Sequence, residues 1–153
     1  MTTTGTPTAE QAPLAPESLL PRVSIVIPIY NEEASIPELL ERLTKVAERM
    51  GKPTEIVLVD DGSRDRSVEM LRAWRTDAAE IVVVELTRNF GQHAAVMAGF
   101  AQCRGDIVVS LDADLQNPPE EIPNLVAKME EGFDVVGTIR RDRDDPLPRR
   151  LAS

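Results

Sequence analysis

Two aspartates spaced two residues apart, Asp112 and Asp114, carry the strongest chemical signal in the sequence. They follow the apolar run 107–111, which predicts that they lie where a strand runs out into a loop. If the backbone stays extended there, both carboxylates leave on the same face. Two carboxylates held close together repel, and a hard divalent cation, Mg²⁺ or Mn²⁺, relieves that repulsion and prefers oxygen ligands. The amide carbonyl of Gln116 could extend such a ligand set.

The same pair also fits an acidic turn that caps the following helix, so its spacing alone leaves both interpretations open. Polar residues elsewhere favour a ligand site, because they too follow apolar runs. In an open parallel sheet, ligands bind outside the carboxyl ends of the strands. Four polar clusters on one rim are hard to attribute to solvated loops. The clusters are Tyr30, Asn31 and Glu32; Asp60 and Asp61; Arg88 and Asn89; and Asp112 with Asp114.

Apolar runs alternate with helical periodicities five times along the chain. The runs are continuously apolar, as in strands that helices cover on both faces, and this predicts a doubly wound α/β sheet. Pro28 is expected to end the first strand, and Ser35-x-x-Glu38 predicts a capping box. Strands are expected at 23–27, 55–59, 81–86, 107–111 and 134–137, and helices at 36–50, from Asp65 to Trp74, at 93–102 and from Pro118 to Met129.

Length and charge restrict the class of protein. The 153 residues carry a net charge of −9, which suits one domain and argues against a nucleic-acid binder, since that would need a basic face. The single cysteine, Cys103, excludes an internal disulfide and fits a reducing compartment. No apolar run in the sequence approaches the roughly 18 residues that span a bilayer, and the first residues do not resemble a secretory signal. We therefore expect a cytoplasmic location.

The domain boundaries follow from composition. Residues 1–21, rich in Thr, Pro and Ala, are expected to form a disordered leader, and residues 22–139 one folded domain. The first strand is not followed by a Gly-x-Gly-x-x-Gly or a phosphate-binding Gly-Lys loop, which disfavours a dinucleotide site and a nucleotidyltransferase. A carboxylate-rich rim suits base N–H groups and ribose hydroxyls, and a metal-bearing pair suits a diphosphate.

Four segments together resemble family 2 glycosyltransferases of the GT-A fold, and among them the polyprenyl-phosphate glycosyltransferases. They are VSIVIPIYNEE (23–33), LVDDGS (58–63), RNFGQ (88–92) and LDADLQNPPE (111–120), and the resemblance covers residues 22–153. It implies that residues 22–139 form a nucleotide-sugar-binding GT-A domain, with a Rossmann-like, mainly parallel sheet flanked by helices. It also implies a nucleotide-diphosphate sugar donor, with UDP favoured, and a polyprenyl phosphate acceptor at the inner face of the membrane. The acceptor phosphate oxygen would attack the anomeric carbon with inversion, while the metal stabilises the leaving nucleotide.

The resemblance also implies roles for individual residues. Asp112, Asp114 and Gln116 would hold the metal, and Asp60 would contact the base. Arg140 would lie near the donor or acceptor phosphates and act with the aspartate pair in catalysis. For Asp61, a turn carboxylate capping Gly62 and Ser63 is an equal alternative to a ligand role. The residues expected around the nucleotide are Pro28, Tyr30, Asn31, Glu32, Asp60, Asp61, Asp112 and Ala113.

The resemblance also implies a larger enzyme. Such enzymes continue into an acceptor-binding half, so the Arg- and Asp-rich residues 140–153 are expected to begin a missing region. Two functions stay open: a glycosyltransferase, or a nucleotide-sugar-binding module without transferase activity. An apolar surface left by the missing half could drive formation of a homo-oligomer. His93, the only histidine, is expected to make a local hydrogen bond.

Overall fold

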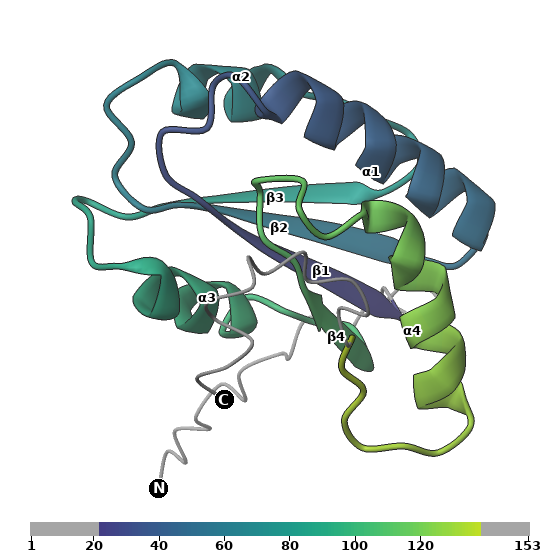
Figure 1. Ribbon diagram of the computed structural model, residues 1–153. Coiled ribbons are helices and arrows are strands. Elements are labelled where there is room, and N and C mark those ends of the chain that lie inside the picture. Colours follow the sequence, from purple (N-terminus) through teal and green to yellow (C-terminus); the bar gives the residue numbers. More distant parts are fainter. Residues whose placement is uncertain (1–21, 139–153) are drawn as a thin grey trace, which may run out of the picture.

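The computed structural model describes residues 22–138. The predicted leader (1–21) and tail (140–153) therefore lie outside the described residues. The elements alternate between strand and helix, as the sequence predicts (Figure 1). They are β1 (Val23–Ile29), α1 (Ile36–Met50), β2 (Thr54–Asp60), α2 (Ser67–Ala73), β3 (Glu80–Glu85), α3 (Gln92–Phe100), β4 (Ile107–Ser110), the short 3₁₀ helix η2 (Pro119–Glu121) and α4 (Ile122–Glu130).

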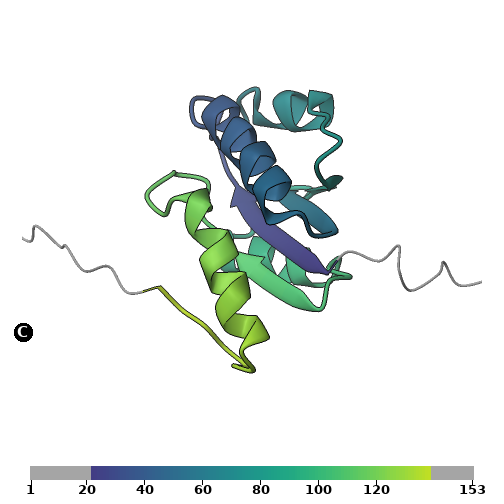
Figure 2. The ribbon, with the colours of Figure 1, turned by 90° about the vertical axis from the view of Figure 1, so that its right-hand side faces the viewer.

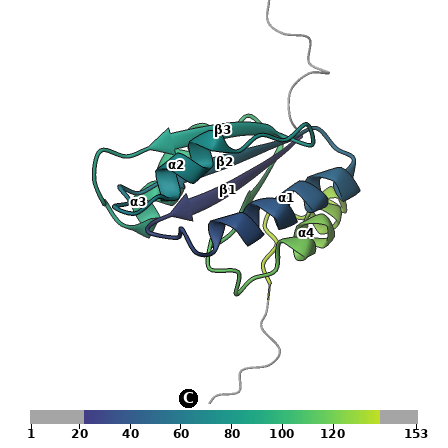
Figure 3. The same cartoon turned by 90° about the horizontal axis from the view of Figure 1, so that it is seen from above.

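The four strands within the described residues form one parallel sheet in the order β3-β2-β1-β4. Helices α1, α2 and α4 cover one face and α3 covers the other, and α1 and α4 lie side by side (Figures 2 and 3). This is the predicted doubly wound α/β architecture. Because all strands are parallel, their carboxyl ends meet at one edge of the sheet, where the polar clusters were expected.

The core is aliphatic and divided by the sheet. Alternate residues of each strand point to opposite faces, so every second residue of β1, from Val23 to Ile29, packs under α1 and α4. Val26, Val57 and Val59 face α3 instead, where Ala95 is fully buried. Small residues on the inner side of α3 let this helix approach closely, because a Cβ at Gly99 would collide with the side chain of Val26.

The prediction that Pro28 ends the first strand is wrong, because β1 continues to Ile29. The Val26 carbonyl accepts from the N–H of Leu111 at 3.0 Å, so alternate residues of β1 face β4. Pro28 is the next residue facing that side, but β4 has already ended at Ser110. On its other side β1 keeps pairing with β2 up to Ile29 and Asp60. The missing N–H of Pro28 therefore costs no bond of the observed ladder.

Two further local predictions are also wrong. Ser35 has helical backbone angles and makes no capping bond; its hydroxyl donates to the Glu32 carboxylate at 2.5 Å, and Glu38 pairs with Arg42 instead. The strand expected at 134–137 is not formed, because this segment does not pair with any of the strands β1 to β4 and Val135 is 87% exposed. A short apolar run that stays mostly exposed lacks the burial that stabilises a strand.

Candidate active site

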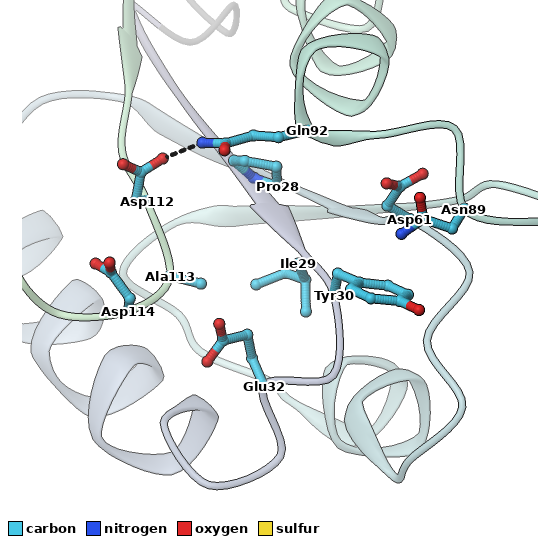
Figure 4. Close-up of a pocket in the computed structure, with 10 residues that line it drawn as sticks. All are labelled: Pro28, Ile29, Tyr30, Glu32, Asp61, Asn89, Gln92, Asp112, Ala113 and Asp114. Carbon is cyan, nitrogen blue, oxygen red and sulfur yellow. Dashed lines mark hydrogen bonds between the residues drawn. The ribbon is translucent and has the colours of Figure 1, made fainter.

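A pocket with a volume of about 290 Å³ opens at the carboxyl ends of β1, β2 and β4 (Figure 4). Loops that follow all four strands contribute to its walls, with Asn89 coming from the loop after β3, and α3 contributes its first residue. Pockets at this edge are the usual ligand sites of open parallel sheets. Its lining residues are Pro28, Ile29, Tyr30, Glu32, Asp61, Asn89, Gln92, Asp112, Ala113 and Asp114.

The loop after β1 is fastened to the loop after β2. The backbone N–H of Asn31 donates to the Ser63 hydroxyl at 2.9 Å, and the Asn31 side-chain oxygen accepts from the N–H of Arg64 at 2.8 Å. Asn31 adopts a left-handed φ of 55°, which asparagine tolerates better than most residues. Its side chain is thus used in the turn, and it does not line the pocket. Tyr30 and Glu32, on either side of it, both do.

Asp60 is the last residue of β2 and Asp61 the first residue after it, and the two make different hydrogen bonds. Asp60 is buried, and one carboxylate oxygen accepts from the N–H groups of Gly62 and Ser63, both at 3.0 Å. The turn-capping role considered for Asp61 therefore belongs to Asp60. The other Asp60 oxygen, Oδ1, is buried and has no hydrogen-bond partner among the described residues. Asp60 does not line the pocket, so its contact with a base stays a prediction.

Asp61 lines the pocket and is also buried. Its two oxygens accept from the backbone N–H groups of Phe90, at 2.7 Å, and Gly91, at 2.9 Å. Gly62 packs against the same segment so closely that a Cβ there would lie 2.5 Å from the carbonyl carbon of Arg88. The end of β2 thereby fixes the path of the chain into α3.

The first residue of α3 reaches the aspartate pair. Gln92 donates from Nε2 to Oδ1 of Asp112 at 2.6 Å, the bond drawn in Figure 4. Asp112 follows β4 by two residues, and Ala113 beside it is buried in the core. The loop therefore presents Asp112 to the pocket while its neighbour anchors the backbone.

Asp114 lines the same pocket, on the other side of Ala113 in Figure 4. The backbone is not extended here, because β4 ends at Ser110 and Leu115 adopts a left-handed φ of 60°. A leucine in this region is strained, and such strain is held at sites where the surroundings fix the loop. The turn lets the Gln116 N–H donate to Asp114 Oδ1 at 3.0 Å. The side chain of Gln116 does not line the pocket.

The far side of this loop is fastened to α1. Arg42 donates from Nε and Nη2 to the two oxygens of Glu120, at 2.8 and 2.6 Å. The hydrogen bonds from Arg42 lower the pKa of Glu120 to about 2. A two-point Arg–carboxylate contact fixes orientation as well as distance. The loop 111–118 is thus held between β4 and the η2–α1 contact.

The pocket is acidic. Four of its lining residues are carboxylic acids, Glu32, Asp61, Asp112 and Asp114, and none is Lys or Arg. A diphosphate could not approach this surface without added positive charge. The oxygen donors suit a hard divalent cation. No three His, Cys, Asp or Glu side chains within residues 22–138 form a metal-binding group, so a cation here would need further oxygens from its ligand.

The structure brings together seven of the predicted site residues: Pro28, Tyr30, Glu32, Asp61, Asp112, Ala113 and Asp114. Asn31, Asp60 and Gln116 lie beside the pocket in sequence but do not line it, and Arg140 lies outside the described residues. Sequence reasoning did not assign Ile29 or Gln92 to the site, and placed Asn89 on the rim without a role. The sequence did contain one indication for Gln92: it directly follows Gly91, the residue before α3, and so begins a helix at the carboxyl edge of the sheet.

No helix between residues 22 and 138 has both the length and the apolar character needed to cross a membrane. The longest among them, α1, has 15 residues and one strongly polar side. The exposed His93 does not line the pocket.

Comparisons with known proteins agree with this geometry. The model of the family "Glycosyl transferase family 2" matches residues 24–153. The undecaprenyl-phosphate 4-deoxy-4-formamido-L-arabinose transferase of Shewanella sediminis is 60% identical over 132 residues. That match covers 86% of this chain, and the chain spans 40% of the length of the relative.

Two solved structures have the same arrangement of elements. A mannosyltransferase from Pyrobaculum calidifontis, in complex with GDP-Man and Mn²⁺, superposes with a TM-score of 0.59 at 30% identity, covering 76% of this chain and 35% of its own. Glucosyl-3-phosphoglycerate synthase from Mycobacterium tuberculosis, in complex with Mn²⁺ and UDP, gives 0.55 at 27% identity, covering 71% and 39%. These similarities confirm the GT-A fold expected from the motifs, and the chain belongs to glycosyl transferase family 2.

Proposed function

We propose that this chain carries the donor-binding part of a glycosyltransferase that moves a sugar from a nucleotide-diphosphate sugar, UDP-linked, to a polyprenyl phosphate at the inner face of the membrane. The observation that carries the proposal is the acidic pocket at the carboxyl ends of the strands, lined by Glu32, Asp61, Asp112 and Asp114. The name of the S. sediminis relative supports an undecaprenyl phosphate acceptor. This chain spans 40% of that relative, and we propose the complete transfer reaction for the enzyme to which such a chain contributes its donor site.

The residues fit a divalent cation, Mg²⁺ or Mn²⁺. Asp112 and Asp114 would hold it, together with oxygens of the donor diphosphate, and the side chain of Gln116 is a further candidate. When bound, such a cation supplies the positive charge that favours departure of the nucleotide diphosphate. The mannosyltransferase from P. calidifontis, crystallised with GDP-Man and Mn²⁺, supports this assignment.

The remaining lining residues would bind and orient the donor. Tyr30, which is 42% exposed, offers an aromatic ring, and Asn89 offers a side-chain amide. The Glu32 carboxylate, held by the Ser35 hydroxyl at 2.5 Å, is oriented to accept from a hydroxyl of ribose or sugar. The acceptor phosphate is already an anion, so its attack on the anomeric carbon needs no strong general base. Arg140 would neutralise phosphate charge during the attack.

Calorimetric titration of the chain with UDP, UDP-sugars and GDP-mannose, with and without Mn²⁺, tests the donor site. We expect Mn²⁺-dependent binding of one nucleotide class. Asp112→Asn and Asp114→Asn should each weaken it by at least about tenfold, because each removes an anionic ligand. Asp134→Asn, an exposed carboxylate outside the pocket, is the matched control. Absence of nucleotide binding by the unsubstituted chain under all these conditions would contradict the proposal.

A second candidate is a nucleotide-sugar-binding module that does not transfer the sugar. The pocket is assigned to the donor and its cation, and binding of a donor without transfer would use the same lining residues. A transfer assay to polyprenyl phosphate separates the two functions. Transfer of labelled sugar supports the glycosyltransferase, whereas tight donor binding without transfer supports the module.

A further inference from the structure

A continuous set of contacts joins the end of β2 to the end of β4, although β1 lies between these strands in the sheet. It begins at Asp61, whose buried carboxylate accepts from the N–H groups of Phe90 and Gly91 at 2.7 and 2.9 Å. Both oxygens of Asp61 are thus occupied by backbone donors. They hold Gly91, with its φ of 94°, as the residue that precedes α3.

The contacts continue through the first residue of α3. With Gly91 fixed, the side chain of Gln92 extends toward Asp112 (Figure 4). Its Nε2 donates to Oδ1 of Asp112 at 2.6 Å. Gln92 is the one hydrogen-bond donor to this carboxylate within residues 22–138. The side chain belongs to the pocket wall and not to the protein core.

We infer that Gln92 is a positioning residue, which orients the Asp112 carboxylate for its cation, and that Asp61 acts through Gln92 by fixing the start of α3. The inference rests on the proposed function, because it takes Asp112 as a ligand of the cation. A bond to Oδ1 restrains rotation of the carboxylate, and Asp112 would then offer the ion an oriented oxygen ligand. Partners that orient a ligand in this way commonly tune metal affinity.

The chemistry of an amide suits this position better than that of a charged donor. A Lys or Arg at residue 92 would also bond to Asp112, but its positive charge would repel the cation. The amide is a neutral donor, so it orients the carboxylate without neutralising it. The pocket thus keeps its full negative charge to attract the ion, and the bound ion would in turn offset the repulsion between that charge and a diphosphate.

The test compares Gln92→Met with His93→Ala in the full 153-residue chain. Methionine keeps the length of the side chain but removes the donor, and the exposed His93 is the neighbouring control outside the pocket. The affinity for Mn²⁺ in the presence of UDP is measured from the electron paramagnetic resonance signal of free Mn²⁺. We expect Gln92→Met to weaken Mn²⁺ binding by about tenfold and His93→Ala to leave it unchanged. Circular dichroism and the melting temperature should be the same for all three proteins.

A double-mutant cycle separates positioning from a general structural effect. In the Asp112→Asn background, Gln92→Met should have no further effect on Mn²⁺ affinity. The same tenfold loss in both backgrounds would overturn the inference, as would an unchanged affinity in Gln92→Met alone. Failure of the unsubstituted chain to bind Mn²⁺ with any nucleotide would instead refute the proposed function, and the inference with it.

Discussion

The side chain of Arg104 clamps the carboxylate of Glu55 at the amino end of the sheet, opposite the pocket. Nε and Nη2 of Arg104 donate to Glu55 Oε2 at 3.0 and 2.9 Å, and the Ser24 hydroxyl donates to Oε1 at 2.5 Å. Glu55 is fully buried. Burial alone would raise its pKa, but the bonds from Ser24 and Arg104 outweigh burial and hold the pKa below 4.5.

Glu55→Gln is expected to lower the free energy of unfolding by about 2 kcal/mol at neutral pH, because it removes the charge that the donors satisfy. A lowered pKa stabilises the fold above the ordinary value of 4.5, and this contribution is lost as the pH falls below it. The variant should therefore lose less stability than the unsubstituted chain between about pH 5 and pH 3. Urea unfolding across this range measures both effects. Glu69→Gln, on the exposed side of α2, is the control, and an unchanged pH dependence in Glu55→Gln would contradict the prediction.

Gly99→Ala is expected to destabilise the fold by about 1–3 kcal/mol, because the added methyl group enters a packed interface. Its Cβ would overlap the Val26 side chain and approach Val59 Cγ2 to 3.0 Å. Since α3 carries Gln92, the shift should also weaken nucleotide binding. Gly137→Ala, where a Cβ meets no atom within 4 Å, should change stability by less than about 0.5 kcal/mol. Equal stability losses in the two variants would show that α3 does not pack as described.

Gly62→Ala should reduce both stability and donor binding. The residue has a φ of 72°, and its Cβ would lie 2.5 Å from the backbone of Arg88. Gly51→Ala provides the matched control, because Gly51 has a φ of 58° but open space around it. The stability of the control should fall by only about 1 kcal/mol, because alanine is strained at this φ, and its nucleotide binding should be unchanged. Thermal unfolding and titration with UDP and Mn²⁺ measure how much more Gly62→Ala loses than Gly51→Ala. That difference reports the contact between the loop after β2 and the loop after β3.

Treatment with EDTA is expected to abolish nucleotide binding while leaving the fold intact. The core beneath the pocket is aliphatic, and the loop 111–118 that carries Asp112 and Asp114 is held by the contact between Arg42 and Glu120, which needs no metal ion. Circular dichroism should therefore be unchanged, and added Mn²⁺ or Mg²⁺ should restore binding. Nucleotide affinity that survives complete chelation would contradict the assignment of a cation to Asp112 and Asp114.

Much of the fold could be predicted from the sequence because its strands are encoded by local composition. The runs around Ile25, Val57 and Val83 are mainly apolar, and Gly51 ends α1 in the left-handed conformation that glycine favours. The segment after Phe133 shows the limit of that signal. The valines of this segment suggest a strand, but a strand forms only if the segment hydrogen-bonds to another strand, such as β4 at the edge of the sheet. The local sequence does not encode whether it does.

The site was predictable in outline and not in its internal bonds. The rule that ligands bind at the carboxyl ends of strands located Tyr30, Glu32 and the aspartate pair. The rule does not distinguish Asp60 from Asp61, since each lies where β2 ends. Asp60 accepts hydrogen bonds from the turn after β2, and Asp61 accepts them from the segment before α3. This difference depends on which backbone N–H groups the folded loops bring close to each carboxylate. The bond from Gln92 to Asp112 likewise joins residues 20 positions apart through tertiary structure.

Pro28 has a consequence for the shape of the pocket. Had β4 continued to pair with β1 beyond Ser110, the next rung would need an N–H at Pro28, donating to the carbonyl of Leu111. Proline has no such group, so the two chains must part there. Hydrogen bonds between β1 and β4 therefore cannot extend across the pocket and close it. Pro28 alone is enough to keep the two chains apart at the place where a ligand would enter.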